Sequence, residues 1–189
     1  MNSLTLIHPQ PLTPARWSAL CGGAASLAHR SGVCVWFDPV RLGALPKRHA
    51  LAVLSLKLDG FGSVHRSHGS EAADELLRIV VMRLSRAVGP DDMVNHLKGG
   101  EFACLLSGLP RREQLSQLAW KLLDVMSAPM RVGALRLAVL PCIGIAMWPG
   151  DGSTHQALLA NAAAAMYRAK RQKSGFAFFE ESADVWVEP

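Results

Sequence analysis

The feature that most constrains this chain is a pair of adjacent glycines, Gly99 and Gly100, between two short apolar runs. The runs, 93–97 and 102–106, have the composition of β-strands, and glycine reaches the positive φ values that tight hairpin turns require. Glu101 follows the pair, so the turn would bring backbone N–H groups and a carboxylate together at a sheet edge. This arrangement suits a phosphate or metal site, although an ordinary hairpin turn explains the same local residues.

Hydrophobic periodicity predicts helices and strands that alternate around one sheet, which is typical of an α/β fold. The expected strands are 51–58, 93–97, 102–106, 130–132, 135–145 and 176–180, and the expected helices are 70–88, 111–126 and 155–170. Before these elements, Thr13 and Pro14 are typical of a helix start, so a helix is expected to about Arg30, followed by a short strand over 33–37.

Several segments resemble, in order, the landmarks of the GGDEF (diguanylate cyclase) family. Residues 97–106 resemble its signature hairpin, usually Arg-Leu-Gly-Gly-Asp-Glu-Phe followed by an apolar strand. The other matching segments are 51–61 (first strand and metal loop), 73–77 (a helix), 142–152 (closing strand) and 161–170 (last helix). The resemblance implies a ferredoxin-like, nucleotidyl-cyclase-type fold, with a central mixed sheet flanked by helices in a single domain.

The resemblance also indicates how the chain is divided. We expect a degenerate GGDEF domain over 49–180, an N-terminal helix and loop extension over 1–48, and a C-terminal tail over 181–189. The extension departs from the family, whose entry segment leads into a long helix before the first strand.

The family condenses two GTP molecules into cyclic di-GMP, and the resemblance implies that this chain has lost the metal ligands for that reaction. Lys57 and Gly100 occupy the positions of the two acids that hold Mg²⁺ in the family. Glu101 remains as the only remnant catalytic position, and we expect it to form an ion pair with Lys57 where the metal would sit. Neither a metal site nor a cofactor is therefore expected, and Mg²⁺ would be needed only by a residual cyclase.

Nucleotide-binding positions of the family are partly retained. His65 replaces a guanine-reading Asn, its partner acid is kept as Asp74, and Lys98 replaces the first signature glycine. The candidate nucleotide-binding residues are His65, Asp74, Lys98, Gly99, Gly100 and Lys170. Simpler explanations exist: Asp74 and Lys170 suit the ends of helices, and His65 and His68 are expected on an exposed loop.

Three further positions bear on this interpretation. The arginine of the family's inhibitory product site is replaced by Gly89, three residues before Asp92. Met166 and Tyr167 are expected in the core.

Composition sets the remaining limits. The net charge of +5 permits an anionic ligand but does not argue for nucleic acid, because the aromatic residues are not interleaved with the basic ones. The four cysteines have no paired spacing, so buried thiols are expected. The sequence shows neither a signal peptide nor a membrane span, and a cytoplasmic protein is expected.

Three functions stay open at this point. The first is an inactive regulatory or scaffold domain in cyclic di-GMP-linked signalling, with a protein partner such as another GGDEF or EAL protein. The second is a sensor that binds GTP or cyclic di-GMP without turnover, since Lys57 and Lys98 could neutralise phosphates. The third is a residual cyclase that uses Glu101 and Asp59.

Overall fold

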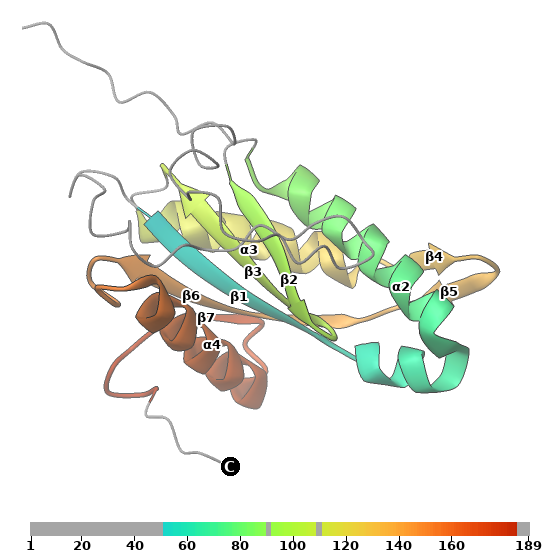
Figure 1. Ribbon diagram of the computed structural model, residues 1–189. Helices are drawn as coiled ribbons and strands as arrows, with labels where there is room; N and C mark the ends of the chain where they lie inside the picture. The colour runs from blue at the N-terminus through green and yellow to red at the C-terminus, as the bar shows by residue number, and fades with distance from the viewer. Residues whose placement is uncertain (1–50, 90–91, 109–110, 185–189) are drawn as a thin grey trace, which may run out of the picture.

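The computed structural model describes residues 51–89, 92–108 and 111–184. The helix and strand expected before residue 50, and two of the four cysteines, lie outside this range. Its elements are β1 (Leu51–Asp59), α2 (Phe61–Ala87), β2 (Met93–Lys98), β3 (Glu101–Ser107), α3 (Arg112–Ser127), β4 (Met130–Val132), β5 (Leu135–Leu137), β6 (Leu140–Trp148), α4 (His155–Gln172) and β7 (Phe176–Phe178), labelled as in Figure 1.

Five strands form a mixed sheet in the order β2-β3-β1-β6-β7. β1 lies at its centre and pairs antiparallel with both β3 and β6, whereas β6 and β7 are parallel. β4 and β5 form a separate two-stranded sheet. Helices α2 and α3 cover one face of the large sheet and α4 covers the other (Figure 1). The expected α/β fold, a central mixed sheet flanked by helices, is thus confirmed.

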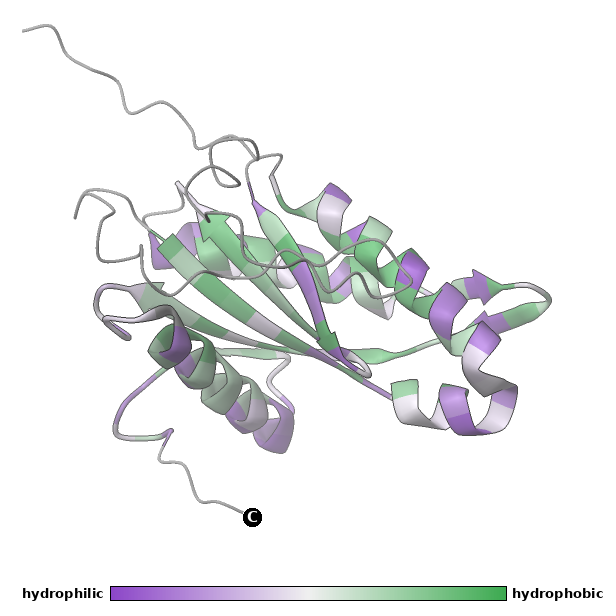
Figure 2. Ribbon diagram, in the orientation of Figure 1, coloured by the Kyte–Doolittle hydropathy of each residue, from purple (hydrophilic) through white to green (hydrophobic). Residues whose placement is uncertain are grey.

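Alternation along β1 sends its side chains to two different cores. Leu54 and Leu56 pack with buried residues of α2 and α3, and Val53 packs with Leu158 and Ala162 of α4. The strands of the large sheet are mostly hydrophobic, and hydrophilic residues lie on the outer sides of the helices (Figure 2). Because the side-chain period is two, Lys57 lies on the same face of the sheet as Val53, towards α4.

The helix predicted over 70–88 is the second of two helical segments that make up α2. Gly69, with a φ of 82° and a ψ of 177°, is not helical and separates it by a kink from a first segment that begins at Phe61 and was not predicted. Before the kink only Phe61 and Val64 are buried, so this segment lacks the periodicity that predicts a helix. Consequently His65 and His68 are exposed residues of a helix rather than of a loop.

The predicted strand 135–145 was also wrong, because the structure divides this segment into β5 and the longer β6. β5 pairs with β4, whereas β6 begins at Leu140 and pairs with β1. Val139 between them is buried, so the apolar pattern continues across the break. β7 ends at Phe178, two residues before its predicted end. In the described part of the chain, no helix combines the length and apolar character that a membrane crossing requires.

Candidate functional site

The ion pair expected between Lys57 and Glu101 is present. The two residues are direct partners in the antiparallel register of β1 and β3, so their side chains lie on the same face. Lys57 Nζ lies 2.7 Å from Glu101 Oε1, and the side chains are 27% and 20% exposed. Tyr167 of α4 completes the group: Lys57 Nζ donates to its hydroxyl at 3.3 Å and lies 5.1 Å from its ring centroid.

A second ion pair lies next to the first. Lys170 Nζ is 2.5 Å from Asp59 Oδ1 and joins the last full turn of α4 to the end of β1. The sequence left the direction of Asp59 open, and periodicity alone could not reveal this contact. β1 continues to Asp59, and this residue therefore points to the same side as Lys57.

The pairing favours the charged form of Lys57. Its hydrogen bond to Glu101 raises the pKa of Lys57 above its ordinary value, and the hydrogen bond to Tyr167 adds to this effect. Partial burial opposes the shift without cancelling it, so the pKa of Lys57 remains raised. Lys57 is accordingly an ammonium at neutral pH.

The turn between β2 and β3 is fixed by close packing. Gly99 has a φ of 50°, and Leu58 N donates to Gly100 O at 2.9 Å, which ties the turn to β1. A Cβ placed on Gly100 would lie 2.8 Å from Phe61 Cβ and 3.1 Å from Leu58 O. The sequence indicated that Gly100 replaces a carboxylate of the family. The structure adds that this conformation leaves no room for a side chain at position 100.

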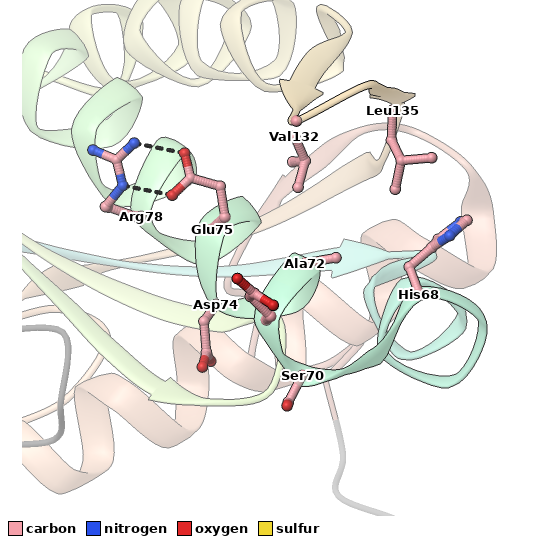
Figure 3. A pocket seen from close by; sticks show the side chains of 10 residues that line it. His68, Ser70, Ala72, Asp74, Glu75, Arg78, Val132 and Leu135 are labelled. Atoms are coloured by element: carbon pink, nitrogen blue, oxygen red, sulfur yellow. Dashed lines mark hydrogen bonds and ion pairs between the residues drawn. The ribbon is translucent and has the colours of Figure 1, made fainter.

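The nucleotide-binding candidates do not all lie together. Lys98 is exposed and opposes Glu101 in the hairpin, while Lys170 belongs to the second ion pair. Asp74 lines a pocket of about 970 Å³ between α2 and the β4–β5 hairpin, whereas His65 is not part of its lining. Figure 3 shows this pocket, with Glu75 bonded to Arg78 on α2 and two apolar residues of the hairpin on the opposite wall.

Two further expectations can be compared with the structure. Met166 is buried as expected, with its sulfur 3.6 Å from Ser55 Oγ, but Tyr167 is 41% exposed and does not belong to the core. One helix position separates the two side chains by about 100°, and in α4 this turns Tyr167 away from the face that buries Met166. Asp92 accepts hydrogen bonds from Gly89 N and Ser107 N, which gives this acid a structural role.

The expectation of buried thiols holds for only one of the two cysteines in the described region, because Cys142 is partly exposed. Cys104 and Cys142 are free, Cys104 is fully buried, and burial raises its pKa to about 12.

The donor set does not fit a pair of magnesium ions. Mg²⁺ needs several oxygen ligands, but each carboxylate at this end of β1, Asp59 and Glu101, is bonded to a lysine ammonium. Within residues 51–89, 92–108 and 111–184, no three His, Cys, Asp or Glu side chains are grouped so that they could hold a metal ion.

Comparison with known proteins gives a consistent family. Residues 41–175 match the family model "Diguanylate cyclase, GGDEF domain". Over 135 residues, 71% of this chain, the sequence is 39% identical to the bifunctional diguanylate cyclase/cyclic di-GMP phosphodiesterase MucR of Pseudomonas aeruginosa. The chain spans only 20% of the length of that relative.

Solved structures agree. The GGDEF domain of TpbB from Pseudomonas aeruginosa is 35% identical with a TM-score of 0.66, covering 70% of this chain and 78% of that domain. An EAL/GGDEF domain protein from M. capsulatus is 34% identical with a TM-score of 0.67, covering 75% and 93% of the two chains.

Proposed function

Because the chain belongs to the GGDEF family, we propose that it is a GGDEF domain without cyclase activity that acts in cyclic di-GMP-linked signalling through a protein partner. The family relation supports the signalling context. The loss of activity and the protein partner are inferred from the chemistry of the site.

The observation that carries the proposal is the ion pair between Lys57 and Glu101. Phosphoryl transfer depends on cations that neutralise charge and position the reacting groups. The ammonium of Lys57 lies where the resemblance places a metal-binding acid, and Glu101, the remaining signature acid, is already bonded to it at 2.7 Å. A metal would have to displace a covalently attached cation before it could bind the carboxylate.

The packing of Gly100 supports the same conclusion. An acid at this position would need room that Phe61 and Leu58 O occupy. Steric crowding at Gly100 as well as the charge of Lys57 therefore supports the proposal.

The test is to incubate the full chain with GTP and either Mg²⁺ or Mn²⁺ and to measure cyclic di-GMP by chromatography. The full-length diguanylate cyclase TpbB of Pseudomonas aeruginosa is the positive control. We expect a rate lower than that of the control by ~10³-fold or more, because transition-state charge is not stabilised. A rate like that of the control would refute the proposal.

A sensor is the second candidate, and exposed Lys98 favours it. Among the described residues this lysine has no ion-pair partner, so its ammonium can meet a phosphate. Calorimetric titration with GTP and with cyclic di-GMP separates the candidates: binding without turnover would favour the sensor, and binding of neither would favour the scaffold. A residual cyclase would require Asp59 and Glu101 to leave their lysines.

A further inference from the structure

A row of aromatic rings with one arginine lies on the side of the sheet that α3 covers. It consists of Arg112 and Trp120 of α3 and Phe176 and Phe178 of β7, which we call the aromatic ledge. The rings of Trp120 and Phe176 meet edge to face with centroids 5.3 Å apart, and those of Phe176 and Phe178 are 6.1 Å apart. Arg112 Cζ lies 4.3 Å from the Phe178 centroid.

The ledge is open to solvent at both ends. Trp120 is 60% exposed, although an indole of this size would gain from burial. Arg112 is exposed, and within the described part of the chain no carboxylate lies within ion-pair distance of its guanidinium. Tryptophan and arginine are the residues that most often carry binding energy at protein interfaces. The ledge combines both on a rigid base of packed rings.

Side chains of the protein occupy the outward carbonyl groups of the adjacent sheet edge. In the parallel ladder, Gly175 O and Phe179 N bond to β6, so the main-chain groups of Phe176 and Phe178 point away from the sheet. Phe176 O accepts from Ser174 Oγ at 3.1 Å, and Phe178 O accepts from Arg168 Nη2 at 2.5 Å. Side-chain donors already occupy the acceptors that an added strand would use, which favours a partner that binds through the side chains of the ledge.

We propose that the aromatic ledge is the docking site for the protein partner, through a segment that carries an apolar side chain and a carboxylate. The inference rests on the proposed function. Charge complementarity selects the chemistry. The guanidinium of Arg112, which stacks on a ring and has no ion-pair partner among the described residues, matches a carboxylate in two parallel hydrogen bonds, and the face of Trp120 matches an apolar group. Arg112 and Trp120 are eight residues apart, about 12 Å along the helix, so the segment must place its two groups within that distance.

The probe is a displayed library of random 12-residue peptides, selected on the purified full chain. We expect enriched peptides to pair Asp or Glu with a large apolar residue. Their affinity for Trp120→Ser and for Arg112→Glu should fall by about tenfold or more. Exchange of the peptide carboxylate for lysine should restore binding to Arg112→Glu. Leu140→Ser and Arg136→Glu, exposed positions outside the ledge, are matched controls and should bind like the parent.

Hydrogen exchange of the parent with a selected peptide gives a readout that does not depend on how the variants fold. Protection should appear in 112–120 and 176–178. The inference is overturned if no acidic-apolar peptide is enriched, if the ledge variants bind as the parent does, or if protection appears elsewhere. Self-association in sedimentation that Trp120→Ser abolishes would also overturn it, because the occupant would then be a second copy. GTP turnover is measured separately, so failure here and failure of the proposed function give different results.

Discussion

The two hairpins of the structure turn at similar glycines but differ in what holds them. Gly99 between β2 and β3 has a φ of 50°, and Gly133 between β4 and β5 has a φ of 57°. The first turn is bonded to β1 through Leu58 N and packs against Phe61, whereas no atom lies within 4 Å of a Cβ placed on Gly133. The first turn is thus tied to β1 and packed at Gly100, whereas the turn at Gly133 faces open space, although Met130 and Val132 of the same hairpin are buried in the core.

The ion pairs beside the two hairpins differ in the same way. Lys57 and Glu101 are 27% and 20% exposed, while Arg78 and Glu75, beside the pocket of the β4–β5 hairpin, are 64% and 39% exposed. Water screens the second pair far more than the first. Residues at the end of β1 should therefore be sensitive to substitution, and those at the pocket should tolerate it.

The largest effect is expected for Gly100→Ala. Its Cβ would overlap Phe61 and Leu58 O, and overpacking of this kind lowers the free energy of unfolding by about 1–3 kcal/mol. Denaturant unfolding of the parent and the variant measures it. Gly150→Ala is the matched control, because no atom lies within 4 Å of its Cβ. Equal losses at both positions would show that the first hairpin is not held by packing.

A smaller effect is expected when the Lys57 ion pair is broken. Lys57→Ala leaves a half-buried carboxylate without its cation, which should cost about 1–2 kcal/mol of unfolding free energy. Adding Glu101→Ala should restore part of this loss, with a coupling of about 0.5–2 kcal/mol. The double-mutant cycle is measured by thermal unfolding of the parent, Lys57→Ala, Glu101→Ala and the double variant.

Arg78→Ala is the control for that cycle, and no measurable change in thermal stability is expected for it. Millimolar Mg²⁺ should stabilise neither the parent nor the Lys57 variants. Additive losses from Lys57→Ala and Glu101→Ala would mean that the two side chains do not interact.

The smallest effect is a dependence on alkaline pH. Because the folded-state pKa of Lys57 is raised, its contribution to stability is complete below the ordinary lysine pKa of about 10.4 and is lost as pH rises through the folded-state value. The difference in melting temperature between the parent and Lys57→Met should be constant from pH 8 to about pH 10 and should decrease above it. A difference that did not change up to about pH 12 would contradict the assignment.

The sequence predicted those parts of the fold in which one face of an element is buried. The hairpin and the second part of α2 have clear periodicity, and β1 ended only one residue beyond its predicted limit. The helical segment before Gly69 was not predicted, because few of its residues are buried. The break between β5 and β6 was not predicted, because Val139 is buried although it lies between the two strands and belongs to neither.

Contacts in the site were predictable where they depend only on which strands pair and in what register. Lys57 and Glu101 converge because β1 and β3 pair, and the resemblance to a known hairpin indicated that pairing. The contact of Asp59 with Lys170 could not be predicted, because it depends on where α4 crosses β1. The same holds for Gly100 and Phe61, whose contact depends on the path of the loop after β1.

The ammonium of Lys57 is attached to the chain, and this gives the site a property that no dissolved ion has. A bound metal exchanges with solvent, and its occupancy follows its concentration and falls when a chelator is added. Lys57 is covalently attached, and its effective concentration at Glu101 is set by the pairing of β1 with β3. The geometry at this end of the sheet should therefore be identical in EDTA and in magnesium-rich buffer.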